Sequence, residues 1–114
     1  MLRIVYGRTA FLFAADAEQE EEQRMIHAYG DALRSSVLKV GHHGSAAGTS
    51  EPWLEAVAPD VAVISVGRMN KFGHPAPSTM QRLASRGIEI HRTDIDGAVL
   101  MVSDGDTVRI LDWR

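Results

Sequence analysis

Short apolar segments rich in β-branched residues alternate along the chain with amphipathic segments that carry charged residues. The apolar segments have the pattern of strands and lie at residues 2–6, 9–14, 37–40, 61–66, 88–91, 98–102 and 108–111. The amphipathic segments have helical periodicity and lie at residues 18–33, 51–58 and 78–86. This alternation is typical of a layered α/β domain, and the last two strands are expected to form an antiparallel hairpin.

Capping signals and helical periodicity define the expected helices. Acidic residues crowd the start of the first helix, as the helix dipole favours, and Met25, Ile26 and Tyr29 fall on one face. Ser50 is expected to cap the second helix and Ser78 the third, because a serine hydroxyl can accept a hydrogen bond from a free amide of the first turn. The sequence thus predicts three helices, the first of which buries the face that carries these apolar residues.

The composition fits one globular domain. The 114 residues are 45% hydrophobic and 24% charged, and no apolar run approaches the roughly 18–20 residues that a membrane-spanning helix needs. No basic start precedes an apolar stretch, so no signal peptide is expected. Because the chain has no cysteine, disulfides and thiolate ligands are excluded, and any metal ion must be held by nitrogen and oxygen.

Charge is distributed unevenly along the chain. The net charge of −3 argues against a protein that mainly coats nucleic acid. Residues 62–92, however, contain five basic residues and one acidic residue. Arg82 and Arg86 are expected on solvated helix faces. Arg68 and Lys71 fall in an expected loop, where their charges suit the binding of an anion.

The most informative segment is Val-Leu-Lys-Val-Gly-His-His-Gly-Ser at residues 37–45. His42 and His43 directly follow a predicted buried strand, and the glycines on either side let the backbone approach a ligand closely. Ligands of α/β proteins bind at the carboxyl ends of strands, and imidazole is the commonest side-chain ligand of zinc and similar ions. The pair therefore indicates either a metal-binding turn or a polar loop that two histidines cap.

Polar residues also follow two other predicted strands, with Asp16 after the second strand and the segment from Arg68 to His74 after the fourth. If these strands neighbour the strand of the histidine pair, the three groups converge on one sheet edge, where a carboxylate and imidazoles suit Zn²⁺ or Mn²⁺. Alternatives stay open: Asp16 can cap the acidic helix, and His74 can be a structural residue of its loop. His27 and His91 lie in no motif and are expected to be surface or edge residues.

Several segments, taken in order, are similar to a known family. These segments are FLFAAD at residues 11–16, VLKVGHHGS at 37–45, VISVGR at 63–68, GHP at 73–75, RTD at 92–94 and DGAV at 96–99. Together they resemble the metallo-β-lactamase fold, and most closely the soluble domain of ComEC-type DNA-internalisation (competence) proteins. The resemblance implies that residues 1–114 are the C-terminal half of such an α/β domain: half of an αββα sandwich, with a mixed sheet, helices on one face and a C-terminal antiparallel hairpin.

The resemblance also implies roles for the polar residues at the expected sheet edge. Asp16 occupies the position of the aspartate that bridges two metal ions in the family, and His42 that of the last histidine ligand. His43 would then support that ligand or face the substrate, and His74 belongs to a Gly-His-Pro loop that borders the active site. The implied catalytic residues are Asp16, His42, His43 and His74, the implied substrate-binding residues are Ser45, Arg68, Asn70 and Lys71, and the implied cofactor is zinc or manganese.

The chain departs from the family pattern in several places. Ala14 and Ala15 replace the usual Thr-Gly before the aspartate, and Ala76 replaces a second histidine after the Gly-His-Pro loop. The family's main metal motif, His-x-His-x-Asp-His, is absent from the sequence. Asp16 and His42 are two ligands, whereas a catalytic zinc normally has three protein ligands and a water. The chain is therefore expected to be a fragment of a longer protein, a chain completed by another, or a degenerate remnant.

The function that the resemblance implies is metal-dependent hydrolysis of a phosphodiester such as DNA in a ComEC-like uptake protein, incomplete without an N-terminal half. The alternatives are a degenerate, non-catalytic module and a stand-alone hydrolase of another ester or lactone, because the fold hosts many chemistries. Expected partners are DNA and either the missing half or further copies of the chain. A ComEC-like protein would place the domain on the extracytoplasmic side of the bacterial membrane, and otherwise a cytoplasmic location is expected.

Overall fold

A five-stranded mixed sheet organises the computed structural model, which describes residues 1–111. In spatial order its strands are β1 (Leu2–Tyr6), β2 (Thr9–Phe13), β3 (Val37–Lys39), β4 (Val61–Ile64) and β5 (Glu89–Arg92). β1 pairs antiparallel with β2, and the other strands pair in parallel with their neighbours. The predicted mixed sheet is therefore confirmed, and β2, β3 and β4 all end at the same edge.

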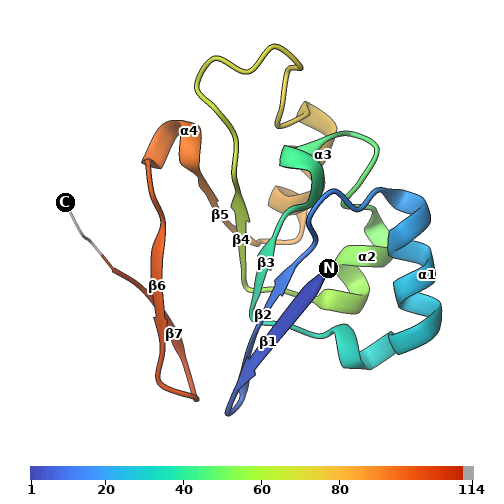
Figure 1. Cartoon of the computed structure of the whole chain (residues 1–114), viewed down its shortest axis with the longest axis vertical. Coiled ribbons are helices and arrows are strands. Elements are labelled where there is room, and N and C mark those ends of the chain that lie inside the picture. The colour runs from blue at the N-terminus through green and yellow to red at the C-terminus, as the bar shows by residue number, and fades with distance from the viewer. Residues whose placement is uncertain (112–114) are drawn as a thin grey trace.

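Helices and a β-hairpin lie on opposite faces of this sheet (Figure 1). The helical elements on one face are α1 (Gln19–Tyr29), the 3₁₀ helix η1 (Gly30–Leu33), α2 (Glu51–Val57) and α3 (Pro77–Ser85). A short helix α4 (Thr93–Asp96) then leads to the hairpin of β6 (Leu100–Ser103) and β7 (Val108–Leu111). The antiparallel hairpin is confirmed. The described residues thus form three layers, and assignment of this α/β domain as half of a metallo-β-lactamase sandwich stays a prediction.

The main core lies between the sheet and the helices. Alternate residues of the central strands point toward the helices, and Leu38 and Ile64 are completely buried there. Trp53 and Leu54 of α2 pack against these strand residues and are also completely buried. Removing a large apolar side chain from water contributes about 1.5–3 kcal/mol, so this layer supplies most of the stability of the fold.

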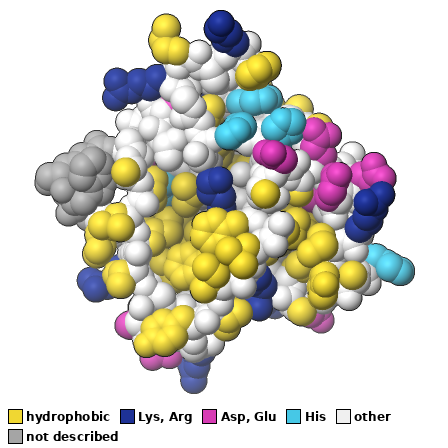
Figure 2. All heavy atoms as spheres, viewed as in Figure 1, with side chains coloured by type: hydrophobic (Ala, Val, Ile, Leu, Met, Phe, Trp, Pro, Cys, Tyr) yellow, Lys and Arg dark blue, Asp and Glu magenta, His cyan; other side chains and the backbone are white. Residues whose placement is uncertain are grey.

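The opposite face of the sheet is also apolar, but it is only partly covered. A cavity of about 330 Å³ separates the sheet from the hairpin, and its lining includes Phe11, Val37 and Val63 of the sheet and Met101 of the hairpin. Val37 is only 4% exposed, because the hairpin shields it on the face that the helices leave uncovered. Figure 2 shows hydrophobic side chains gathered over this region, between the hairpin and β1.

Contacts between two turns anchor the hairpin to the edge of the sheet. The backbone N–H of Arg8 donates to the carbonyl of Gly105 (2.6 Å), and the hydroxyls of Thr9 and Ser103 share a hydrogen bond (2.6 Å). Gly7 has a φ of +59°, and a Cβ there would collide with the backbone of Gly105. Glycine is therefore required at this position both for its conformation and for the close approach.

The structure corrects three details of the helices. The first helix ends at Tyr29, because the chain changes to a 3₁₀ helix there. Tyr29 is 57% exposed rather than buried. The third helix begins at Pro77 with Ala76 as its N-cap, so the predicted cap at Ser78 is wrong. Proline suits the first helical position because its φ is fixed and its missing N–H would lack a partner there. Ser50 does cap α2, and its side chain accepts a hydrogen bond from the N–H of Trp53.

Candidate functional site

The loops that follow β2, β3 and β4 meet at one edge of the sheet. The backbone N–H of His42 donates to the carbonyl of Ala15 (2.8 Å), which joins the loop after β3 to the loop after β2. The N–H of Ala76 donates to the carbonyl of Gly44 (2.9 Å), which joins it to the loop after β4. Histidine side chains gather at this edge beside an acidic group (Figure 2). The parallel strands therefore bring the predicted polar segments together.

The histidine pair lies in a 3₁₀ turn, η2 (Gly41–Gly44), with a left-handed backbone at both histidines. The φ angles are +49° at His42 and +54° at His43. L-residues rarely adopt this conformation, and it costs on the order of 1–2 kcal/mol per residue. Strain of this kind persists only where the surrounding structure imposes it, and it is concentrated at functional sites.

Close packing on both sides of the turn imposes this conformation. A Cβ on Gly41 would lie 2.8 Å from the carbonyl oxygen of Ala17, and a Cβ on Gly44 would lie 2.6 Å from the Cβ of Pro75. Real side chains do not approach so closely, so both glycines are required for the three loops to meet. The sequence predicted that these glycines let the backbone approach a ligand closely, and in the structure the close neighbours are Ala17 and Pro75 of the protein itself.

The imidazole rings of three histidines form a cluster. The ring centroid of His42 lies 5.8 Å from that of His74 and 6.4 Å from that of His43. Two imidazoles on one tetrahedral zinc ion, each with a Zn–N distance of about 2.0 Å, have centroids roughly 5 Å apart. The Nδ1 atoms of His42 and His74 are buried and accept or donate no hydrogen bond within the described residues. The two rings are therefore close enough to border one metal site.

Neighbouring oxygen atoms orient two of these rings. Nδ1 of His42 lies 2.9 Å from Oε1 of Glu18, although the two are not aligned for a hydrogen bond. Nδ1 of His43 lies 2.7 Å from the carbonyl oxygen of Ser65. If that nitrogen carries the proton, Nε2 of His43 is left as the acceptor. In many metal sites, an oxygen atom on one ring nitrogen likewise orients the other nitrogen toward the metal.

Asn70 fixes the position of His74. Its Oδ1 accepts a hydrogen bond from the backbone N–H of His74 (2.8 Å), and its Nδ2 donates to the carbonyl of the same residue (2.7 Å). The ring of Phe72, which is 81% exposed, stacks on the ring of His74. Asn70, which the resemblance implies as a substrate-binding residue, thus uses its side chain to shape the loop in this structure.

A buried carboxylate holds the loop that continues from the histidine turn. Glu22 of α1 is 1% exposed. Its Oε1 accepts hydrogen bonds from the N–H (3.0 Å) and hydroxyl (2.8 Å) of Ser50, and its Oε2 accepts one from the N–H of Thr49. Three donors thus point at the Glu22 carboxylate, and both of its oxygens accept hydrogen bonds although the side chain is buried. Glu22 therefore anchors residues 49–50 to α1.

Arg82 holds the same loop from the side of α3. Its guanidinium donates to the carbonyls of Thr49 (2.9 Å) and Gly48 (3.1 Å). The hydroxyl of Thr79, one turn earlier, donates to the carbonyl of Ser45 (3.1 Å). The expectation that Arg82 lies on a solvated helix face is therefore wrong, because its side chain is needed to satisfy carbonyl groups of the loop. Arg86, by contrast, forms a surface ion pair with Glu51.

The remaining predicted site residues differ in their surroundings. Asp16 is exposed and directly follows Ala15, the residue that contacts His42. Ser45 is 8% exposed and its hydroxyl accepts a hydrogen bond from the N–H of Ala47, within the loop. Arg68 and Lys71 are exposed, and within residues 1–111 their side chains form no hydrogen bond or ion pair. They are the two charged residues among these substrate-binding candidates, and their side-chain donors are unengaged there.

Asp16 does not cap the first helix. The N-cap is Glu18, whose side chain accepts a hydrogen bond from the backbone of Glu21, while the Glu21 side chain accepts one from the backbone N–H of Glu18. Hydrogen bonds from the backbone N–H groups of Glu21 and Glu18 lower the pKa of the Glu21 carboxyl from its usual value. The capping alternative for Asp16 is therefore wrong, and its carboxylate is left for another role.

Three residues that shape the site were missed by sequence reasoning. Glu18 and Glu22 belong to an acidic run that suggested only a helix start, and Arg82 suggested a solvated face. A signal for Glu22 was present, because it lies three and four residues before Met25 and Ile26 and therefore on the apolar face of the helix. No such signal exists for Glu18, whose contact with His42 depends on how three loops meet.

Within residues 1–111, no group of three or more histidine, aspartate or glutamate side chains is arranged to hold a metal ion. In the same part of the chain, no helix has the length and apolar character that crossing a bilayer requires. The metal ligands and the roles implied for Asp16, His42, His43 and His74 therefore stay predictions.

The chain is similar to segments of much longer proteins. It is 39% identical over 99 residues to "Competence protein ComA" of Neisseria gonorrhoeae, a match that covers 87% of this chain and 14% of that protein. It is 41% identical over 108 residues to "Recombination protein 2" of Haemophilus influenzae, covering 95% of this chain and 13% of that protein. It is 34% identical over 93 residues to "ComE operon protein 3" of Bacillus subtilis, covering 82% of this chain and 12% of that protein.

These similarities support a competence protein of the ComEC type. No family model matches the chain, and no solved structure matches it. The chain spans 12–14% of the length of these three relatives, so they relate it to one segment of a competence protein and not to the whole. The names of two of these relatives refer to competence and to recombination, and none of the three mentions a metal or a hydrolytic activity.

Proposed function

We propose that this chain is the C-terminal part of a metal-dependent hydrolase domain that cleaves a DNA phosphodiester in a ComEC-type uptake protein. The observation that carries the proposal is the histidine cluster at the carboxyl edge of the sheet, where the rings of His42 and His74 lie 5.8 Å apart. The loop that bears Asp16 contacts the same turn through Ala15. Metal-dependent hydrolases of the metallo-β-lactamase type, which the sequence resembles, place their site at such an edge.

In this proposal Asp16 and His42 are the metal ligands, and His43 and His74 border the site. A divalent ion bound there would supply a nucleophile at neutral pH by lowering the pKa of a bound water, and it would act as a Lewis acid toward phosphate. Glu18 holds the ring of His42 from one side, and the carbonyl of Ser65 holds that of His43. The contribution of the chain is therefore to present imidazole nitrogens from a rigid turn.

Arg68 and Lys71 are the residues proposed to contact the phosphate. Both lie in the loop after β4 that leads to His74, both are exposed, and neither side chain forms an ion pair within residues 1–111. Cationic side chains near a reacting phosphate stabilise the charge that develops on its oxygens. In this proposal they hold the DNA backbone beside the histidines without contacting the bases.

The domain is proposed to be completed by a second half that packs on the hairpin face of the sheet. On that face Ile4 is 48% exposed and Phe13 is 38% exposed, beside an apolar cavity of about 330 Å³. Exposed apolar surface of this kind usually marks an interface. The relatives are several times longer than this chain, so they have ample sequence for such a half, which would supply the missing metal ligands.

The decisive experiment compares the chain alone with a completed domain. The chain would be fused to the segment that precedes its matching region in the gonococcal relative, and hydrolysis of a fluorescent single-stranded DNA would be measured with Mn²⁺ and Zn²⁺. We expect little or no hydrolysis by the 114-residue chain and metal-dependent hydrolysis by the fusion. Asp16→Ala and His42→Ala should each reduce the fusion's rate by at least about a hundredfold, whereas His27→Ala, in an exposed histidine of α1, should leave it unchanged.

Three other outcomes would contradict the proposal in different ways. A folded fusion that binds no metal and cleaves nothing would favour the non-catalytic module. Metal-dependent cleavage of a carboxylic ester or lactone, but not of DNA, would favour a hydrolase of another substrate. Strong hydrolysis by the 114-residue chain alone, abolished by Asp16→Ala, would show that the chain itself completes the site with ligands not recognised here.

A further inference from the structure

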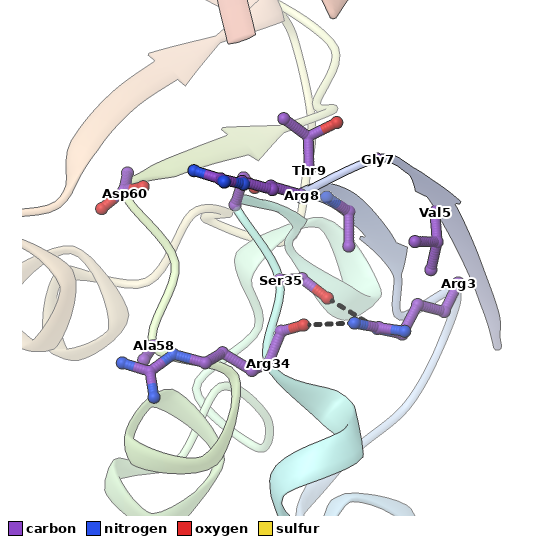
Figure 3. A pocket seen from close by; sticks show the side chains of 11 residues that line it. Arg3, Val5, Gly7, Arg8, Thr9, Arg34, Ser35, Ala58 and Asp60 are labelled. Carbon is purple, nitrogen blue, oxygen red and sulfur yellow. Dashed lines mark hydrogen bonds between the residues drawn. The ribbon is translucent and has the colours of Figure 1, made fainter. Parts of the chain in front are cut away.

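A polar pocket lies at the opposite end of the sheet from the histidine cluster, where β2 and β3 begin (Figure 3). Its volume is about 430 Å³. Its polar lining comes from β1, the β1–β2 turn, the start of β2 and the two loops that precede β3 and β4. The charged side chains among these are Arg3, Arg8, Arg34 and Asp60. This pocket contains no residue of the histidine cluster, so it is separate from the site already described.

Arg3 is held in a fixed position at this pocket. Its Nε donates to the hydroxyl of Ser35 (3.2 Å), and one terminal nitrogen donates to the carbonyl of Arg34 (2.6 Å). Figure 3 shows both hydrogen bonds, with the guanidinium lying between β1 and the loop before β3. Because the side chain is already ordered, a ligand that binds to its remaining N–H groups need not order a flexible side chain.

The other two arginines have no strong partner. The side chain of Arg34 forms no hydrogen bond or ion pair within residues 1–111. Arg8 makes one loose contact, 3.9 Å from Asp106, in which the two side chains are 88% and 76% exposed. Exposed ion pairs of this kind contribute at most about 1 kcal/mol. Both guanidiniums are therefore free to bind an anion.

The charges and donors around the pocket suit a phosphate group. Three guanidiniums and one carboxylate, that of Asp60, line it in a chain whose net charge is −3. The positive charges outnumber the carboxylate by two, and a concave site with an excess of one sign of charge attracts a ligand of the opposite sign. Guanidinium presents paired N–H donors that match the oxygens of phosphate better than an ammonium group does. The hydroxyl of Ser36 also lines the pocket, whereas that of Ser35 already donates to the carbonyl of Leu33 (2.9 Å).

We propose that this arginine pocket, defined by Arg3, Arg8 and Arg34, binds a phosphate group, either free or in the backbone of a nucleic acid. This inference does not rest on the proposed hydrolase, because it uses residues at the other end of the sheet. If the ligand is DNA, the pocket holds the strand away from the histidines and does not take part in cleavage. The phosphate oxygens accept hydrogen bonds from the guanidiniums, and no covalent step occurs.

The test is a pair of NMR titrations of the ¹⁵N-labelled chain, one with inorganic pyrophosphate and one with a short oligodeoxythymidylate. We expect both ligands to shift the amide signals of Gly7, Ser35 and Ser36 and the Nε signal of Arg3, while the amides of Gly41 and Gly44 move less. Pyrophosphate alone shifting these signals would identify the source as a free phosphate compound, and tighter binding of the oligonucleotide would identify it as nucleic acid.

Charge-matched variants separate the pocket from general electrostatic attraction. Arg34→Gln keeps a polar side chain but removes an unpartnered charge, so it should weaken binding by about tenfold. Arg8→Gln should act in the same direction with a smaller change. Arg24→Gln, in an exposed ion pair with Glu20 on α1, removes the same charge elsewhere and should leave the dissociation constant within about twofold.

The proposal is overturned if neither ligand shifts the pocket signals, if the oligonucleotide shifts only signals near the histidines, or if all three variants weaken binding equally. Circular dichroism of each variant confirms that it folds. Should Arg34→Gln fail to fold, the comparison of Arg8→Gln with Arg24→Gln still decides, because the Arg8 side chain is 88% exposed and its replacement should not disturb folding. The result is independent of hydrolysis, so failure here leaves the proposed hydrolase site untouched.

Discussion

The two faces of the sheet differ in how completely they are buried. Toward the helices, Leu38, Leu54 and Ile64 are completely inaccessible to solvent. Toward the hairpin, Ile4 and Phe13 remain 48% and 38% exposed, although the strand pattern is as apolar there. The helix-covered face is apolar and fully buried, whereas the hairpin face is apolar but partly exposed to solvent. The apolar residues of one face are therefore buried by the helices, and we expect those of the other face to be buried by a further partner.

The hairpin leaves this face open because it is attached at its two ends. At one end, Thr9 and Arg8 bind Ser103 and Gly105. At the other end, the hydroxyl of Thr93 accepts a hydrogen bond from the N–H of Val66 (2.8 Å) and donates one to its carbonyl (3.0 Å). Between these attachments lies the apolar cavity. The hairpin thus covers only part of this face.

The largest expected effect contrasts one aromatic residue on each face. Trp53→Ala removes a completely buried side chain from the helix-covered core and should lower the free energy of unfolding by about 3–5 kcal/mol. Phe13→Ala removes a side chain that is 38% exposed and should cost less than about 1.5 kcal/mol. Urea denaturation of both variants measures the difference. Equal costs would mean that the hairpin face is as well packed in solution as the helix-covered one.

The second prediction concerns the carboxylate buried on the helix side. Glu22→Ala removes the acceptor of three hydrogen bonds and leaves the N–H groups of Thr49 and Ser50 without that partner. It should lower the free energy of unfolding by about 2–4 kcal/mol. Glu20→Ala, in an exposed residue of the same helix, is the control and should cost less than about 0.5 kcal/mol. Hydrogen exchange should show loss of protection at both amides only in the first variant.

The third prediction concerns association through the hairpin face. Because Ile4 and Phe13 are exposed beside other apolar residues, we expect the purified chain to self-associate or to require its missing half for solubility. Phe13→Asp should weaken self-association by at least about tenfold, since it places a charge in the interface, while the free energy of unfolding changes little. Light scattering at increasing protein concentration measures the self-association of the wild type and of the variant. A wild-type chain that stays monomeric and monodisperse contradicts this prediction.

The smallest expected effect is a pH-dependent one on the hairpin side. Arg92 donates two hydrogen bonds to the carboxylate of Asp94 (3.0 and 2.7 Å), and they lower the pKa of that carboxyl below its usual 3.8. The carboxylate form therefore stabilises the folded state above about pH 4, and this contribution is lost as the pH falls through the lowered pKa. Asp94→Asn should cost about 0.5–1 kcal/mol at neutral pH.

Denaturation at several pH values tests whether the stability contributed by the Asp94 carboxylate is lost toward acid pH. The difference in unfolding free energy between the wild type and Asp94→Asn should shrink as the pH falls below about 4 and disappear once the wild-type carboxyl is protonated. A difference that grows toward acid pH would mean that Asp94 is stabilised in its protonated form, which is incompatible with the paired hydrogen bonds from Arg92.

The strands were largely predictable because each follows from a local apolar run. β1 and β7 have the predicted bounds, and β3 and β4 end one and two residues early. The helix ends were less predictable, because proline chemistry at Pro77 outweighed a serine cap at Ser78. The short helix α4 was missed, since four residues carry no helical periodicity and its position depends on Thr93 binding Val66 across the sheet.

For the site, the sequence indicated which loops would meet, because parallel neighbouring strands end at one edge. It did not indicate what surrounds each ring. The contacts of His42 with Glu18 and of His43 with Ser65 depend on a left-handed turn that no periodicity reveals. Likewise Arg82 was assigned to solvent because the loop carbonyls that it satisfies lie thirty-odd residues away in sequence. Long-range contacts of this kind are set by packing and not by local pattern.

The central claim is that a metal site lies at the sheet edge where the loops after β2, β3 and β4 meet. A zinc titration of the ¹⁵N-labelled chain tests this claim most directly. We expect the ring signals of His42 and His74 to shift together, with weak affinity because the ligand set is incomplete. His27 and His91, which lie outside the cluster, should shift much less. Equal shifts for all of the histidines, or none at His42 and His74, would contradict the account.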